Sequence, residues 1–255
     1  MITLEHVVLP SPEQMEFIIE GMRNPMNSWE KSDSYTGYDC KACGHIERDG
    51  ACSKGDPERE HCYDYYGFEL GKNDRNLMKN LANAGTDHRK FMRMMPVYVR
   101  ITAGHTWWSE FDTYKIGTVR NSCSKMHKIH VMGFKIDSFD HEGIDEVGER
   151  AVETFDKVRA TLTWLAKMFN ETNEKKYWRA IIELLPMGFH LTANVELNYE
   201  VLANIYHSRK NHKLDEWREV CRWIENDLPW SDLITGPDIL RKKMNIPKIE
   251  VDKNV

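Results

Sequence analysis

The sequence lacks any apolar run near the roughly 18 residues that a membrane-spanning helix needs. Its first residues, MITLEHVVLPSPEQ, lack the basic start and apolar stretch of a signal peptide. Positive charge is not in excess either, because 35 Lys and Arg against 40 Asp and Glu give a net charge of −5. This balance argues against a general nucleic-acid binder or a membrane-surface protein. These absences predict a cytoplasmic globular protein with neither nucleic acid nor membrane among its partners.

Hydrophobic periodicity predicts a helix-rich chain. A chain of 255 residues fits one large domain with a substantial core. Helices are predicted at 12–23, 73–85, 104–117, 143–170, 174–185, 193–208 and 213–227. Residues 96–103 alternate apolar and polar side chains, which predicts a half-buried strand, and 128–136 is a second strand candidate. The sequence therefore predicts one α+β domain over residues 1–255, helix-rich, with a small antiparallel sheet.

A stretch rich in Gly, Asp and Ser follows the first predicted helix and predicts a long loop, with a Cys-rich insertion at about 35–67. Its four cysteines, spaced C-x2-C-x8-C-x9-C, are Cys40, Cys43, Cys52 and Cys62. One C-x2-C pair with two further thiols could hold a structural zinc ion in tetrahedral geometry. The alternative is an ordered loop with reduced cysteines, since a strong zinc signal would contain two such pairs.

The segment NYEVLANIYHSRKNHKLDEW (198–217) places polar residues where a helix should be apolar. A helix over 193–208 puts Asn198 in the middle of the apolar arc, Arg209 on the same line, Asn204 at its edge and Glu200 on the opposite side. Buried amides and guanidinium groups need hydrogen-bond partners or an anion. Two interpretations stay open. Either Asn198 is a cap and Arg209 complements the helix dipole, or both line a pocket for a planar, partly anionic ligand.

A second polar stretch, DTYKIGTVRNSCSKMHK (112–128), combines cations with hydroxyl groups in a predicted turn. Such a combination suits a phosphate group, whereas a solvated basic loop is the alternative. Cys123 lies close to Lys125 in the sequence and could be reactive, although a single cysteine is more often inert.

Together these stretches resemble the flavin-dependent thymidylate synthases of the ThyX type, in a divergent, phage-type form. LPMGFHLTANVELNYEVLANIYHSR (185–209) aligns without a gap to the family segment that begins Leu-Pro and carries Val-Asn-Ala-Arg. TYKIGTVRNSCSKM (113–126) takes the place of the signature R-H-R-x-x-S-x-N-E-x-S-x-R-Y, and Trp217 also matches after a one-residue shift. The resemblance covers roughly residues 73–225, outside the Cys-rich insertion.

The resemblance implies transfer of a one-carbon unit from methylenetetrahydrofolate to C5 of dUMP, with FAD as redox cofactor and NADPH as reductant. It also implies a homotetramer with sites between subunits. The residues implied are catalytic Arg209; FAD-binding Asn198, Asn204, Lys115 and His88; and nucleotide-binding Thr118, Asn121, Cys123, Ser124 and Lys125.

The signature itself is altered. Thr113, Tyr114 and Lys115 stand in place of Arg-His-Arg. Lys125 replaces the arginine that grips the nucleotide, and Thr192 replaces another substrate-binding arginine. Lysine cannot form the bidentate fork of arginine. Two alternatives therefore remain: a related flavin-dependent enzyme acting on another pyrimidine nucleotide, or a catalytically inactive paralogue that binds nucleotide or flavin.

The zinc interpretation predicts about one equivalent of zinc in the purified protein, because four thiolates complete a tetrahedral site. Metal analysis of the purified protein measures this directly. Less than about half an equivalent would contradict it and favour the reduced-cysteine loop.

Overall fold

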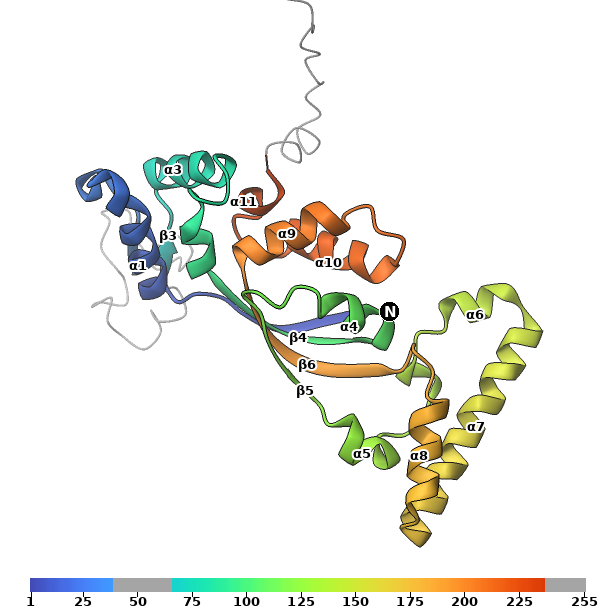
Figure 1. The fold of residues 1–255 in the computed structure, drawn as a ribbon. Helices are drawn as coiled ribbons and strands as arrows, with labels where there is room; N and C mark the ends of the chain where they lie inside the picture. The colour runs from blue at the N-terminus through green and yellow to red at the C-terminus, as the bar shows by residue number, and fades with distance from the viewer. Residues whose placement is uncertain (39–65, 237–255) are drawn as a thin grey trace, which may run out of the picture. The chain divides into compact units, whose positions relative to one another are not determined.

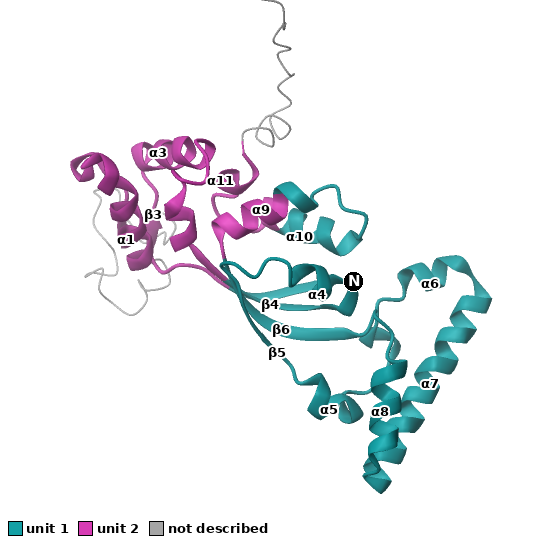
Figure 2. Ribbon diagram, in the orientation of Figure 1, with its two compact units in different colours: residues 1–7, 98–197, 207–223 teal, residues 8–97, 198–206, 224–255 magenta. Residues whose placement is uncertain are grey.

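The computed structural model describes residues 1–38 and 66–236 (Figure 1). The chain forms two compact units, shown in Figure 2. Unit 1 comprises residues 1–7, 98–197 and 207–223, and unit 2 comprises residues 8–97, 198–206 and 224–255. The four cysteines of the zinc prediction lie outside the described residues, and the single domain over residues 1–255 stays a prediction.

A four-stranded sheet, in the order β1-β4-β6-β5, lies mainly in unit 1 (Figure 1). Its strands are β1 (Thr3–Val8), β4 (Pro96–Gly104), β5 (Val119–Ser122) and β6 (His190–Asn198). The edge strand β5 runs antiparallel to β6 and places Asn121 opposite Asn194. The predicted strand at 96–103 is therefore confirmed, as is the helix-rich α+β fold with a small antiparallel sheet.

The helix predicted over 193–208 is wrong in its first part, because residues up to Asn198 belong to β6. The helix α9 begins at Tyr199 and ends at Arg209. In β6 the buried residues Ala193, Val195 and Leu197 alternate with more exposed polar residues. This period of two is the pattern of a strand that covers a core with one face.

The strand predicted at 128–136 is also wrong, because Lys125–Met132 forms the helix α5. The side chain of Ser124 caps this helix by accepting a hydrogen bond from the backbone N–H of His127 (3.3 Å). Ile129 is fully buried in the helical core of unit 1. A short apolar run does not distinguish strand from helix, and here the cap and the tertiary packing select the helix.

Three helices of unit 1 pack around one another: α5, α7 (Glu149–Thr172) and α8 (Lys175–Leu184), seen together in Figure 1. The segment predicted as one helix at 143–170 is divided at Gly148, whose φ of 114° separates α6 (Glu142–Val147) from α7. The shared core consists of Ile129, Phe134, Phe139, Phe155, Leu162, Leu165, Ala166, Ile181 and Phe189.

Unit 2 is built from short elements. Its helices α1 (Pro12–Arg23) and α3 (Lys72–Asn83) match the predictions at 12–23 and 73–85. The strands β2 (Tyr35–Tyr38) and β3 (Tyr66–Glu69) form an antiparallel ribbon. The sequence predicted a long loop after the first helix and did not predict these strands. The other described elements of unit 2 are α11 (Asp232–Thr235) and the 3-10 helices Asn24–Met26, Trp29–Lys31 and Lys90–Met94. The helix α10 (Asp215–Asn226) belongs partly to each unit. A further 3-10 helix, Ile136–Ser138, lies in unit 1.

A buried ion pair joins α1 to α3 in unit 2. The carboxylate of Asp74 has no exposed surface and accepts a hydrogen bond from Nε of Arg23 (2.6 Å). Its second oxygen accepts hydrogen bonds from the hydroxyls of Ser32 (2.8 Å) and Ser34 (2.6 Å). Burial alone would raise the pKa of Asp74, but these hydrogen bonds outweigh burial and hold the pKa of Asp74 below its ordinary value.

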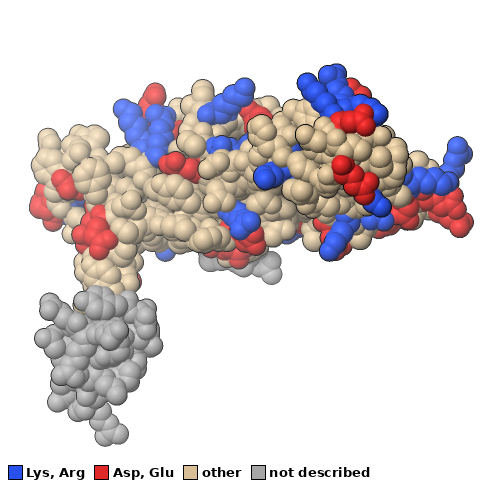
Figure 3. Space-filling model, turned by 90° about the horizontal axis from the view of Figure 1, so that it is seen from below, with Lys and Arg blue, Asp and Glu red and all other residues tan. Residues whose placement is uncertain are grey.

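Charged side chains of both signs are interspersed on the face shown in Figure 3, and neither sign gathers into a large patch there. Across residues 1–38 and 66–236, none of the helices combines the length and the apolar character needed to cross a membrane.

Replacing Asp74 by Asn should lower the free energy of unfolding by about 3–5 kcal/mol, because the buried Arg23 guanidinium loses its counter-charge. Urea unfolding at pH 7 measures this. The exposed Asp137→Asn is the control and should change stability by less than about 0.5 kcal/mol. Equal stability of the two variants would contradict the ion pair.

The same variant tests the pH dependence. Because the pKa of Asp74 is lowered in the folded state, its stabilisation is complete above the ordinary Asp pKa of about 4 and is lost as the pH falls further. The stability difference between wild type and Asp74→Asn should therefore shrink below about pH 4. A difference that stays constant down to pH 2 would exclude the depressed pKa.

Candidate functional site

One carboxylate in unit 1, that of Glu110, gathers three polar side chains. Its Oε2 accepts hydrogen bonds from Nη1 of Arg209 (2.7 Å) and Nε1 of Trp217 (2.9 Å), and it lies 3.4 Å from Nε2 of His212. The backbone N–H of Leu214 donates to Nδ1 of His212 (3.2 Å), and Nε2 of His212 also lies 2.9 Å from Nη1 of Arg209. Glu110 is thus held by two hydrogen bonds, with the imidazole of His212 beside them.

Aromatic rings enclose the guanidinium of Arg209. Its Nε donates to the hydroxyl of Tyr114 (3.0 Å), and its central carbon lies 4.8 Å from the ring centroid of Trp217 and 5.6 Å from that of Tyr114. The Arg209 side chain is 17% exposed. Among the described residues, Nη2 of Arg209 has no hydrogen-bond partner, so this rigid cation keeps one donor for a further oxygen.

The helix α4 (His105–Phe111) supports this cluster. The indole of Trp108 donates to the backbone oxygen of Leu191 in β6 (3.0 Å), which fixes α4 on the sheet. His105 begins α4 and Glu110 lies five residues later, about 7.5 Å farther along the helix axis.

A second cation, Lys125, lies at the other end of α4. Its Nζ is 3.3 Å from Nε2 of His105. Burial lowers the pKa of Lys125; burial, followed by the charges of Lys125 and Arg120, lowers the pKa of His105. His105 is therefore neutral at pH 7 and can accept from the Lys125 ammonium. Within residues 1–38 and 66–236 no carboxylate pairs with Lys125, which leaves its charge available for an anion.

The other residues predicted to bind nucleotide lie near Lys125 along the chain. Ser124 caps α5, and the exposed Cys123 immediately precedes it. Asn121 is exposed on β5. Thr118 donates its hydroxyl hydrogen to the backbone oxygen of Tyr114 (2.6 Å) and so belongs to the preceding turn. The structure thus places Cys123, Ser124 and Lys125 consecutively at the start of α5.

The residues predicted to bind FAD are not gathered within either unit. Lys115 is exposed in unit 1, in the turn after α4. His88 and Asn204 are exposed in unit 2. Asn198 caps α9, because its Oδ1 accepts from the backbone N–H of Val201 (3.0 Å). The cap that one interpretation assigned to Asn198 is therefore present, and ligand binding by Asn198 stays a prediction.

Glu200 does not point away from the core as the helical projection predicted. It is 6% exposed and accepts hydrogen bonds from Arg89 (3.3 Å) and Arg93 in unit 2. The projection treated residues 193–208 as one helix, whereas the strand and helix meet at Asn198.

The sequence did not indicate Glu110, His105 or His212 as site residues, and it marked Tyr114 only as a departure from the signature. A single acidic residue in the aromatic helix HTWWSEF was the available signal, since a carboxylate among buried rings needs a donor. His212 carried no comparable signal, because its partners come from distant parts of the chain.

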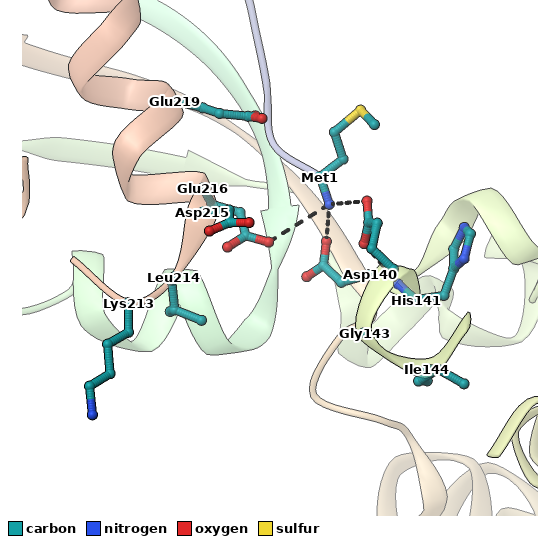
Figure 4. A pocket seen from close by; sticks show the side chains of 11 residues that line it. Met1, Asp140, His141, Gly143, Ile144, Lys213, Leu214, Asp215, Glu216 and Glu219 are labelled. Carbon is teal, nitrogen blue, oxygen red and sulfur yellow. Dashed lines mark hydrogen bonds and ion pairs between the residues drawn. The ribbon is translucent and has the colours of Figure 1, made fainter. Parts of the chain in front are cut away.

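The acidic cavity in Figure 4 does not suit an anion. It has a volume of about 550 Å³, and five carboxylates line it: Asp140, Glu142, Asp215, Glu216 and Glu219. The amino group of Met1 lies among them, 2.5 Å from Asp140 and 3.1 Å from Glu142. A phosphate would be repelled here.

Metal ligands do not converge in the part of the chain that the structure describes: no three His, Cys, Asp or Glu side chains there are placed to hold an ion.

No family model matches the sequence, and no curated protein matches it either. Solved structures are similar. A crystal structure of thymidylate synthase X (ThyX) from Helicobacter pylori with FAD and dUMP has a TM-score of 0.57 at 14% identity, covering 94% of this chain and 98% of that one. A second ThyX structure from the same organism, complexed with FAD and dUMP, has a TM-score of 0.55 at 14% identity, with coverages of 93% and 98%. The chain therefore has a ThyX-like fold.

Replacing Glu110 by Ala should lower the free energy of unfolding by about 1–3 kcal/mol, because Arg209 and Trp217 both lose their acceptor. Urea unfolding measures this, and Glu183→Ala is the control, since the exposed Glu183 pairs with the exposed Arg179. If the two variants were equally stable, Glu110 would not organise this cluster.

Proposed function

We propose that the chain is a flavin-dependent thymidylate synthase of the ThyX type, transferring a one-carbon unit from methylenetetrahydrofolate to C5 of dUMP, with FAD as redox cofactor and NADPH as reductant. The observation that carries this proposal is the position of Arg209. In a chain with a ThyX-like fold, it is rigidly held at the position where the sequence resembles the family's active-site arginine.

The proposed nucleotide contacts come from Lys125 and Arg209, which lie beside the two ends of α4. Lys125 would hold the phosphate, assisted by the hydroxyl of Ser124, because its ammonium has no carboxylate partner among the described residues. Arg209 would donate from Nη2 to a carbonyl oxygen of the pyrimidine. A fixed guanidinium stabilises negative charge that develops on that carbonyl as the base is activated.

Glu110 is a positioning residue in this proposal. Its two hydrogen bonds and the ring of Trp217 leave Arg209 few alternative rotamers, so little reorganisation is needed when the base binds. Tyr114, at the position of the signature histidine, would act in the same way through its hydroxyl.

The residues proposed to bind FAD suit this cofactor in part. Lys115, His88 and Asn204 are exposed and can offer donors to phosphate or ring oxygens. Asn198 can offer only its amide N–H groups, since its Oδ1 already caps α9. When bound, FAD would supply the electrons for reduction of the transferred carbon. A homotetramer with sites between subunits would bring residues of units 1 and 2 from different copies together.

A related enzyme acting on a different pyrimidine nucleotide is the second candidate. Thr192 stands where the family has a substrate-binding arginine, and its hydroxyl is hydrogen-bonded to that of Thr102 (2.8 Å). Loss of one cation near the substrate favours a nucleotide with less negative charge or a different base contact. An inactive flavin- or nucleotide-binding paralogue is the remaining alternative.

Purified protein mixed with FAD, NADPH, methylenetetrahydrofolate and dUMP should form dTMP, which chromatography detects. Flavin absorbance should stay with the protein on gel filtration, at the size of four 30.0 kDa chains. Bound FAD without dTMP, but with a product from another pyrimidine nucleotide, would favour the second candidate. Absence of flavin uptake would contradict both enzyme functions.

Two charge variants should separate nucleotide binding from catalysis. Lys125→Gln should raise the dUMP Kd roughly 10- to 100-fold by removing one charge-assisted hydrogen bond. Arg209→Lys should lower kcat roughly 100- to 1,000-fold while dUMP still binds. The exposed Lys135→Gln and Arg179→Lys are matched controls and should retain wild-type values. Equal kinetics of Arg209→Lys and Arg179→Lys would exclude the catalytic role.

A further inference from the structure

A second cavity, between α5, α7 and α8, has no role in the proposed reaction. Its volume is about 480 Å³, within the range of roughly 300–1,000 Å³ that small-molecule sites occupy. Three apolar side chains and three basic ones form most of its lining: Met126, Phe169 and Trp178, and His127, His130 and Lys175. All six lie in unit 1.

The aromatic part of this cavity is already ordered. The indole of Trp178 donates to the backbone oxygen of Met126 (3.0 Å), which fixes the ring and ties α8 to α5. The ring of Phe169 meets that of His130 with centroids 4.9 Å apart and planes inclined by 64°. Flat rings held in this way offer a flat ligand a preformed surface.

Lys175 brings a positive charge to the polar part of the cavity, and no carboxylate lines the cavity beside it. Glu174, the nearest acidic residue in the sequence to Lys175, is engaged by Lys176 at 2.6 Å. Lys175 has no carboxylate within 4 Å in the described part of the chain, so its ammonium can take an anion from outside.

The imidazole of His130 contacts Phe169 but keeps unused hydrogen-bonding groups. Neither ring nitrogen has a hydrogen bond among the described residues, and Nδ1 is buried. Buried polar atoms in folded proteins almost always have a partner, so His130 keeps a hydrogen-bonding capacity that the described residues do not use.

We propose that this cavity binds a small aromatic anion: a flat ring system bearing a carboxylate. The ring would lie against Trp178 and Phe169, and the carboxylate would face Lys175 and the histidines. The uncompensated positive lining selects against cations, and the ring surfaces select against anions without a ring, such as inorganic phosphate. This inference does not depend on the proposed thymidylate synthase function.

Calorimetric titration of the full chain at pH 7 tests the proposal with three bicyclic probes that differ mainly in charge: 2-naphthoate, 2-naphthamide and 2-naphthylmethylammonium. The anion should bind once per chain, at least about tenfold more tightly than the amide, with no detectable binding of the cation. Binding should be the same with and without added FAD and dUMP.

Matched variants assign the binding to this cavity. Lys175→Gln should weaken naphthoate at least about tenfold, and Trp178→Leu should remove binding. Lys176→Gln and Trp164→Leu are the controls, because these neighbours on α8 and α7 do not line the cavity. Circular dichroism and the urea midpoint establish that each variant is folded.

The proposal is overturned if the three probes bind equally, if none binds at millimolar concentration, or if folded Lys175→Gln binds naphthoate like wild type. Loss of naphthoate in Lys125→Gln but not in Lys175→Gln would place the probe at the nucleotide site and would also overturn it. Failure of the proposed enzyme activity would change none of these titrations.

Discussion

The contact between Glu110 and Arg209 is the constraint on which the candidate site depends. A guanidinium that is only 17% exposed needs a counter-charge, and Glu110 supplies it at 2.7 Å. The same oxygen of Glu110 accepts a hydrogen bond from the indole of Trp217, which fixes the start of α10 against α4. Because Trp108 anchors α4 to β6, the position of Arg209 follows from the packing of the sheet.

The two cations of the candidate site, Lys125 and Arg209, contact opposite ends of the short helix α4. His105 begins α4 and contacts Lys125, whereas Glu110, about 7.5 Å farther along the axis, contacts Arg209. A mononucleotide likewise carries its phosphate and its base carbonyl at separate ends. The two stretches that resemble the family thus each place one cation near α4, Lys125 from 113–126 and Arg209 from 185–209.

The sequence predicted most helices and the strand at 96–103 because their periodicity extends over several turns or residues. It failed at 193–198, where the alternation of β6 adjoins the apolar side of α9 and the two read as one helix. Arg209 was identified from the sequence, but its partners Glu110, Tyr114 and His212 were not. Those contacts join α4, the turn after it and the loop after α9, and no spacing in the sequence reveals such proximity.

The ribbon of β2 and β3 holds two distant positions of the chain together. Tyr38 is paired with Tyr66, so these two residues lie opposite each other in neighbouring strands. Closing a loop costs only about 0.6 kcal/mol more for each doubling of its length. A connection of a different length between Tyr38 and Tyr66 would therefore change the free energy of folding by little more than this closure cost.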